Sequence, residues 1–440
     1  MDDSIAGRTA AEIAGSVRML RDRGELRAGE LLPPVRALAQ QLGVNRNTIV
    51  AAYRQLTQAG LVVTRGRGGT RLADPAPVAQ EGYARDSALR DVGTGNPDPR
   101  WIPDPSAALA AIAGRTVLYG EPVIDAGLEQ WAHPWMTQDL APADVRLTVT
   151  SGAVDAVERL LNQALTRDDA VALEDPCWLA GIQTVRLGGY RAVAVPTDDE
   201  GMTVEGLRAA LDQGVRAVIC TPRAQNPTGA SLSAARAAAL RELLRAHPYV
   251  LVIEDDHFSL LSQQPFHSIV GPEHRRFALV RSVSKFLGPD MCLAVTASDP
   301  DTAQRLALRL SPGTTWVSHL LQRLAHALLA DPAVRDRIAD AGVHYAQRNA
   351  AFAARLADAG LPAAAGDGLN VWVALPVAAR RAADQLRRRG WLARSGDEFG
   401  LDEPASRHLR LTVHDLDDPD AAQLAAALAA SVRAVDAEMG

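Results

Sequence analysis

Lysine is almost missing from this sequence: of 46 basic residues in the 440-residue chain, only Lys285 is a lysine. The abundance of alanine and arginine suggests a mutational bias that replaces lysine by arginine wherever a positive charge is all that is needed. Arginine stays protonated and cannot act as a neutral amine nucleophile, whereas a desolvated lysine can form a Schiff base. Lys285 therefore either survives by chance or supplies amine chemistry that arginine cannot copy.

Cysteines and long apolar runs are also scarce. The three cysteines, Cys177, Cys220 and Cys292, are widely spaced and predict neither a disulfide framework nor a metal site. No apolar run approaches the ~18 residues that a membrane span needs, and the first ten residues lack the pattern of an export signal. With 47% hydrophobic and 22% charged residues, the composition excludes a disordered chain. We expect a cytoplasmic protein without a membrane partner.

Acidic residues are absent between Leu31 and Arg71, although this stretch carries six arginines. Residues 1–71 have a net charge of +5, so the rest of the chain must carry −11 to reach the total of −6. A small basic head on an acidic body indicates a nucleic-acid reader attached to another unit.

The head has the pattern of three helices and a hairpin. Apolar spacing and glycine stops predict helices over residues 9–23, 35–42 and 45–59, with Gly43 at the turn between the last two and Asn45 as an N-cap. Strand-like residues 61–64 and 70–72 flank a glycine-rich turn and predict a basic wing. Residues 74–91 have the composition of a linker.

The body alternates short apolar strands with helical stretches. Predicted strands are 171–174, 192–195, 217–220, 250–253, 277–280, 293–296, 370–374 and 409–413, and two of the predicted helices are 153–165 and 234–246. This alternation predicts an α/β body with a mainly parallel sheet covered on both faces, and ligands at the carboxyl ends of its strands. The last two strands predict a small C-terminal α+β unit.

Three side chains in the body carry a recognisable chemistry. Lys285 comes just after the strand at 277–280, and Asp255 and Asp256 end another strand, where buried carboxylates are costly unless they meet a cation. Pyridoxal phosphate requires a lysine for its aldehyde and a carboxylate for its pyridine nitrogen, so that its ring can act as an electron sink. The segments 174–178 (EDPCW) and 221–229 (TPRAQNPTG) complete this set.

In the head, the segments 32–36 (LPPVR), 43–48 (GVNRNT) and 66–70 (GRGGT) resemble the GntR family of winged-helix repressors over residues 8–72. The resemblance implies a contact to DNA by Arg36, base contacts at the start of the recognition helix, and wing contacts to the minor groove or backbone. The recognition-helix residues are Arg46, Asn47 and Thr48, and the wing residues are Arg65 and Arg67. A winged helix used only for protein contacts is the alternative.

The body resembles the fold type I aminotransferases, and the whole chain resembles the MocR subfamily of GntR regulators. It is most similar to the PtsJ-type members, which carry the 254–258 sequence EDDHF where most members have EDDY. The resemblance implies roles for seven residues: Lys285 binds the cofactor aldehyde, Asp255 pairs with the pyridine nitrogen, Asn226 donates to the ring oxygen, Trp178 stacks on the ring, Ser282 contacts the phosphate, Tyr119 reaches the phosphate of a partner subunit, and Arg410 clamps a substrate carboxylate.

The sequence departs from the family pattern at three places in the cofactor site. His257 replaces a tyrosine, and its charge would change near neutral pH. At the phosphate cradle opened by Gly152, Ala153 and Val154 replace polar residues, so that backbone N–H groups and the helix dipole remain. Cys292 stands where the subfamily usually has a phosphate-binding arginine. We expect weak, reversible cofactor binding.

We therefore expect a DNA-binding regulator whose body senses pyridoxal phosphate, or an amino compound that reacts with it. The resemblance also implies a homodimer and control of vitamin B6 salvage genes. The expected boundaries are 1–73 for the head, 74–91 for the linker, 92–325 for the large domain and 326–440 for the small one. Two alternatives stay open. The chain could be a working aminotransferase with a DNA-binding head, or a repressor whose body is only a cofactor-free dimerisation scaffold.

Overall fold

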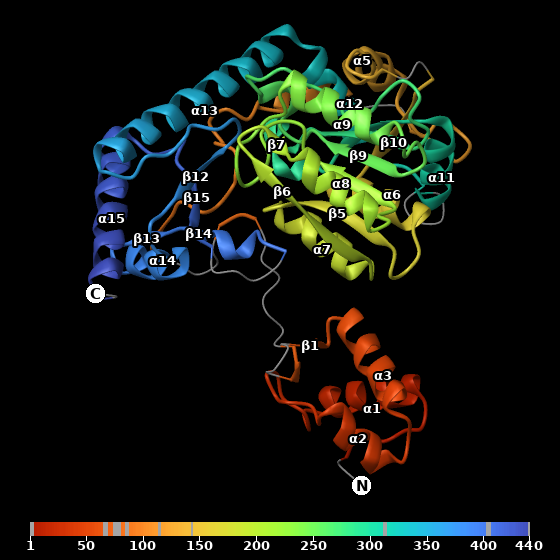
Figure 1. Ribbon diagram of the computed structural model, residues 1–440. Helices are drawn as coiled ribbons and strands as arrows, with labels where there is room; N and C mark the ends of the chain where they lie inside the picture. Colours follow the sequence, from red (N-terminus) through yellow and green to blue (C-terminus); the bar gives the residue numbers. More distant parts are fainter. Residues whose placement is uncertain are drawn as a thin grey trace. The chain divides into compact units, whose positions relative to one another are not determined.

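The computed structural model describes residues 4–64, 69–73, 81–83, 88–112, 116–141, 144–310, 315–401 and 406–438. The chain forms two compact units. Met1–Gln80 with Val185–Arg191 make up the first, here called the head, and Glu81–Thr184 with Ala192–Gly440 make up the second, here called the body. Each unit is described by itself (Figure 1).

The head contains the three predicted helices and the predicted hairpin. They are α1 (Ala10–Asp22), α2 (Val35–Leu42), α3 (Arg46–Gln58), β1 (Val62–Thr64) and β2 (Thr70–Leu72), and the two strands pair antiparallel. Gly43 ends α2 with φ +64°, a left-handed conformation that costs glycine little. Asn45 caps α3, because its side chain accepts the Asn47 N–H at 2.9 Å.

Apolar side chains at helical spacing close the core of the head. Ile13, Val17, Leu38, Ile49 and Leu56 are fully buried between the three helices. The Tyr53 hydroxyl donates to the Pro33 carbonyl at 2.6 Å and so ties α3 to the segment before α2. Packing of this face of α3 leaves its opposite face, which begins with the exposed Arg46 and Asn47, open to solvent.

An eight-stranded sheet forms the centre of the body, in the order β4-β11-β10-β9-β8-β5-β6-β7. Its strands are β4 (Arg146–Thr150), β5 (Ala170–Asp175), β6 (Arg191–Asp198), β7 (Gly201–Met202), β8 (Ala217–Cys220), β9 (Leu251–Asp255), β10 (Phe277–Ser282) and β11 (Ala294–Ser298). Strands β10, β9, β8 and β5 are mutually parallel and almost completely buried, as expected for a sheet covered on both faces. The prediction of a mainly parallel sheet is confirmed.

Two strands of this sheet run against the others. Strand β11 pairs antiparallel with both β10 and β4, and β7 pairs antiparallel with β6. The sequence analysis did not predict β4 or β7. Strand β4 carries an exposed arginine and two threonines, and β7 has two residues, so neither has the apolar run that marks the central strands.

Helices cover the sheet and link it to a smaller C-terminal layer (Figure 1). The helices of the body are α4 (Ser106–Ile112), α5 (Ala126–Thr137), α6 (Ala153–Ala164), α7 (Leu179–Leu187), α8 (Val204–Asp212), α9 (Ala234–Leu244), α10 (Ser284–Leu287), α11 (Pro300–Leu310), α12 (His319–Ala330), α13 (Pro332–Asp358), α14 (Ala379–Arg388) and α15 (Asp418–Ala437). The 27-residue α13 leads from the large sheet to the small one.

The small layer has its own sheet and its own hydrophobic core. Strand β15 (His408–Thr412) lies between β12 (Asn370–Ala374) and β14 (Arg394–Ser395) and is antiparallel to both. A separate parallel pair joins β13 (Trp391–Leu392) to β3 (Arg90–Asp91). In the part of the chain that the structure describes, no helix is long and apolar enough to cross a bilayer.

Candidate functional site

Strand register brings the predicted phosphate contacts to one edge of the large sheet. Ser282, at the end of β10, pairs with Ala294 at the start of β11, and Ala294 pairs with Thr150 at the end of β4. Cys292 lies two residues before the start of β11 and Gly152 two residues after the end of β4, beyond the last paired residues of the two strands. Pairing of Asp255 with Val280 sets the end of β9 beside the same edge.

The N-terminus of α6, predicted to cradle a phosphate, follows strand β4 at this edge. Gly152 precedes the helix with φ +96°, and no side chain caps the first turn. A Cβ added to Gly152 would meet nothing within 4 Å, so the space in front of the helix is open. Ala153 is buried and Val154 is 42% exposed, which leaves backbone N–H groups and the helix dipole as the anion-binding elements.

Two adjacent carboxylates follow the β9 core and have opposite surroundings. Asp256 accepts two hydrogen bonds from Arg223, at 2.8 and 2.9 Å, and one from Arg281 at 2.7 Å. Burial opposes its ionisation, but the two guanidinium groups together hold the pKa of Asp256 below its usual range. Asp256 is therefore a buried, charged and fully paired anchor.

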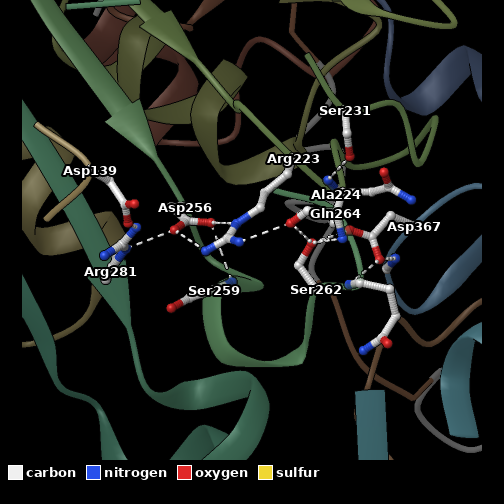
Figure 2. Close-up of polar contacts among 12 residues, drawn as sticks. Asp139, Arg223, Ala224, Ser231, Asp256, Ser259, Ser262, Gln264, Arg281 and Asp367 are labelled. Carbon is white, nitrogen blue, oxygen red and sulfur yellow. Dashed lines mark hydrogen bonds and ion pairs between the residues drawn. The ribbon is translucent and has the colours of Figure 1, made fainter. Parts of the chain in front are cut away.

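Figure 2 shows how this anchor extends on both sides. Arg281 is 1% exposed and also binds Asp139 at 2.7 Å, and Arg223 donates to the Gln264 carbonyl at 3.1 Å. Each guanidinium also lies over the ring of Phe266, at 5.0 and 5.4 Å. The network fixes the ends of β9 and β10 relative to one another.

Asp255 is the unpaired member of the two. Its side chain is buried, and its Oδ1 atom has no hydrogen-bond partner among the residues that the structure describes. Burial, reinforced by the charge of Asp256, raises the pKa of Asp255 to about 7, although Lys285 opposes the shift. A buried carboxylate oxygen without a donor requires a proton or a cationic N–H group from a ligand.

Lys285 lies on the short helix α10, and its Nζ donates to the Gly95 carbonyl at 3.0 Å. Burial lowers the pKa of this amine, and the charge of Arg410 adds to the effect. With a lowered pKa, the amine loses its proton more easily, and the neutral form is the nucleophile. Gly95, Asn226, His257 and Lys285 line one small cavity.

His257 is a neutral group in this cavity. Burial and the charge of Lys285 lower its pKa to about 4. The expectation that His257 changes charge near neutral pH is therefore wrong, because a cationic imidazole would sit in a poorly solvated place beside a second cation. The neutral ring can still donate one hydrogen bond.

Arg410 and Asn226 meet at the other side of the cavity, together with a residue that the sequence analysis did not find. Arg410 on β15 is fully buried and binds Glu81 through two parallel hydrogen bonds of 2.7 Å each. The Asn226 side chain accepts from Arg410 at 3.0 Å and donates to Glu81 at 3.2 Å. The predicted substrate clamp is therefore occupied by a carboxylate of the chain itself.

Trp178 and Tyr119 do not line this cavity, and the residues predicted to contact DNA lie in the head. Trp178 is half-buried just before α7, and Tyr119 is 88% exposed and packs on the Trp316 ring at 5.4 Å. In the head, the residues predicted to contact DNA are exposed or half-buried: Arg36 on α2, and Arg46, Asn47 and Thr48 in the first turn of α3. Arg65 and Arg67 lie outside the described residues.

The residues present fit pyridoxal phosphate. The unpartnered oxygen of Asp255 fits the pyridine N–H, the low-pKa amine of Lys285 fits the aldehyde, and the open N-terminus of α6 fits the phosphate. Such a cofactor supplies an electron sink when bound. The contribution of this chain is a lysine whose pKa is lowered by burial and a carboxylate held without a competing partner among the described residues.

The geometry defines an aminotransferase-like ligand site on a body joined to a winged helix. The chain belongs to the aminotransferase class I and II family, whose pattern matches residues 91–428, and residues 9–72 match the gntR family of bacterial regulatory proteins. It is 46% identical over 423 residues to the vitamin B6 salvage pathway transcriptional repressor PtsJ of Salmonella typhimurium, a match that covers 96% of this chain and 98% of that protein.

Two further proteins, one a regulator and one an aminotransferase, are also similar to this chain. The pyridoxine biosynthesis transcriptional regulator PdxR of Corynebacterium glutamicum is 27% identical over 341 residues, which cover 74% of each chain. The crystal structure of a kynurenine aminotransferase from Pyrococcus horikoshii has the same fold, with a TM-score of 0.73 at 22% identity. That match covers 79% of this chain and 92% of the other.

Three residues of the site were missed by sequence reasoning, and each carries a weak local signal. Arg223 stands inside the TPRAQNPTG segment, and Arg281 begins the run that leads to Lys285, so an arginine next to each motif was available as a partner for Asp256. Glu81 lies in a stretch of linker composition and carries no motif. Only the fold brings it to Arg410.

The two aspartates predict opposite responses to removal of their charge. In the protein without cofactor, Asp256→Asn should destabilise the body by about 3–5 kcal/mol, because it leaves Arg223 buried without its anion and leaves Arg281 with Asp139 alone. Asp255→Asn should cost little, and at alkaline pH it should stabilise the body. Thermal unfolding of the two variants beside the wild type is the measurement.

The raised pKa of Asp255 determines whether stability rises or falls with pH. Its ordinary pKa of 3.8 rises to about 7 in the folded protein, so between these values the unfolded chain has released a proton that the folded protein keeps. Raising the pH through this range therefore lowers the stability of the wild type but not that of Asp255→Asn. Equal melting-temperature differences at about pH 5 and about pH 8 would contradict this account.

Proposed function

We propose that this protein is a dimeric transcriptional regulator that binds DNA through its head and senses pyridoxal phosphate, or an amino compound that reacts with it, through Lys285. The observation that carries the proposal is the pairing of an unpartnered Asp255 oxygen with a low-pKa amine in a body fused to a GntR-type head. The 46% identity to a vitamin B6 salvage repressor supports control of B6 salvage genes.

Exposed apolar side chains support a dimer. Leu118 is 65% exposed, Tyr119 88% and Leu320 60%, and the ring of Tyr119 lies 5.4 Å from that of Trp316, which precedes Leu320 by four residues. A second copy of this body covering them would place Tyr119 at the interface. That position agrees with the predicted role of Tyr119 as a contact to the phosphate bound by the partner.

Weak retention of the cofactor favours a sensor over an enzyme. Cys292 is exposed and stands where the family pattern has a phosphate-binding arginine, which would add charge-assisted hydrogen bonds. Turnover requires a cofactor that stays bound when it is not covalently attached. A sensor of free cofactor concentration requires the opposite property.

Substitution of the first residue of the recognition helix tests the head. Arg46→Ala should weaken binding to the upstream region of its own gene by about 1–3 kcal/mol, roughly 5- to 150-fold, and relax the preference at one base pair. Arg67→Ala in the wing should weaken all sequences alike and flatten the salt dependence. Arg18→Ala, an exposed arginine on α1, is the matched control for charge. If Arg46→Ala behaves like the control, the assignment is wrong.

Substitution of the only lysine tests the cofactor site. Lys285→Ala and the charge-preserving Lys285→Arg should both lose the visible absorbance of a lysine-bound cofactor and the effect of the cofactor on DNA binding, with the fold retained. The measurement is a spectroscopic titration with pyridoxal phosphate, followed by DNA binding with and without it. A wild type without this absorbance at millimolar cofactor would favour the scaffold function, and sustained turnover with a keto acid acceptor would favour an aminotransferase.

Restoring an arginine at the cradle tests the weak-binding argument. Cys292→Arg should tighten cofactor binding by about tenfold or more, because a charge-assisted hydrogen bond is worth roughly 1.5–3 kcal/mol. The control is Cys292→Ser, which adds no charge. Both variants are titrated by the same spectroscopic method, and equal affinities would show that the phosphate gains nothing from a charge at this position.

A further inference from the structure

The strongest unexplained contact in the body is the one between Glu81 and Arg410. The two side chains form a bidentate pair with both hydrogen bonds at 2.7 Å, and Arg410 is fully buried. Burial opposes ionisation of Glu81, but the hydrogen bonds and charge of Arg410 hold its pKa below the usual range. Glu81 is therefore an ionised carboxylate in the place predicted for a ligand carboxylate.

The donors of Arg410 show that the site holds one carboxylate at a time. A guanidinium has four hydrogens on its two Nη atoms, and all four are used: two by Glu81, one by Asn226 and one by the Gly93 carbonyl at 2.7 Å. The remaining donor, Nε, is buried with no partner in the described part of the chain, and one face of the group is covered by the Phe399 ring at 4.8 Å. A second carboxylate finds no free Nη hydrogen.

The backbone around the pair is shaped to accept it. Gly95 has φ +64°, and a Cβ there would lie 2.5 Å from a Glu81 carboxylate oxygen and 3.0 Å from Arg410 Nη2. The Gly82 N–H donates to the Thr94 carbonyl at 2.7 Å, which holds the residue after Glu81 against the same segment. The carbonyl of Gly95 also accepts from Lys285. Gly95, which lines the cavity of Lys285, thus lies against both the ion pair and the amine.

We propose that Glu81 is a built-in competitor for Arg410, so that an amino acid or other carboxylate-bearing amine occupies the site only by displacing Glu81. An amine without a carboxylate reaches Lys285 with Glu81 still in place. The reaction of the amine rests on the proposed function, but the competition of two carboxylates for one guanidinium needs no cofactor. Glu81 is therefore a specificity-determining residue that sets a threshold concentration for carboxylate ligands.

The position of Glu81 in the chain gives this competition a second consequence. Only residues 74–80 separate it from Ala73, the last described residue of the winged helix. Displacement of Glu81 removes its ion pair with Arg410 from the chain segment that leads to the DNA-binding head, and the Gly82–Thr94 hydrogen bond can stay in place. A carboxylate ligand and loss of the Glu81 charge should therefore change DNA affinity in the same direction.

A cofactor-free experiment tests the competition first. Glu81→Ala leaves Arg410 buried without its anion and should lower the melting temperature, and millimolar acetate or propionate should restore stability in this variant but not in the wild type. Glu129→Ala, an exposed glutamate on α5, is the control. The double variant Glu81→Ala with Arg410→Gln should lose the rescue. If acetate stabilises all variants alike, Arg410 does not take a free carboxylate and the proposal fails.

A second experiment uses the protein with cofactor and the isosteric variant Glu81→Gln, which keeps the side-chain shape should Glu81→Ala fail to fold. Spectroscopic titration with L-alanine should show roughly tenfold or greater tightening relative to wild type, whereas ethylamine, which has no carboxylate, should bind both proteins equally. Equal tightening for both amines would overturn the proposal. Absence of any cofactor signal would overturn the proposed function instead, while the acetate experiment would still decide the role of Glu81.

Discussion

The cost of burying negative charge organises this body. Two adjacent aspartates close the central strand β9, and the interior gives two arginines to one of them and no hydrogen-bond donor to an oxygen of the other. Pairing makes Asp256 a rigid anchor between β9 and β10. Because that anchor is rigid, Asp255 cannot move to a position where a hydrogen-bond donor would reach its unpaired oxygen. The unsatisfied group is stable only because its neighbour is so firmly held.

The same reasoning applies at Arg410, where the charge is positive. A buried guanidinium without an anion is costly, so a ligand site built around one must be either filled or compensated. Glu81 provides the compensation from within the chain. The body can therefore remain stable without its ligand, and the free energy of ligand binding is reduced by what Glu81 already contributes. Selectivity for a carboxylate is obtained at some loss of affinity.

Much of the fold could be predicted from the sequence because its signals are local. The apolar runs of β5, β8, β9 and β10 and the cap and stop residues of α2 and α3 lie within a few residues of the elements that they define. The site was harder to predict, because proximity in the sheet depends on register. Lys285 and Asp255 carry recognisable motifs, whereas Glu81 meets Arg410 across 329 residues of chain. The neutrality of His257 also depends on burial that no local pattern encodes.

The scarcity of lysine has a practical consequence for studying this protein. Lys285 provides the only side-chain amine in the sequence, and that amine lies inside the ligand cavity. Amine-directed reagents can therefore modify a single side chain, without any engineered label. Their rate of reaction depends on how often the cavity opens and on whether the amine is free or engaged. The rate at which Lys285 is modified thus measures how far the cavity is occupied.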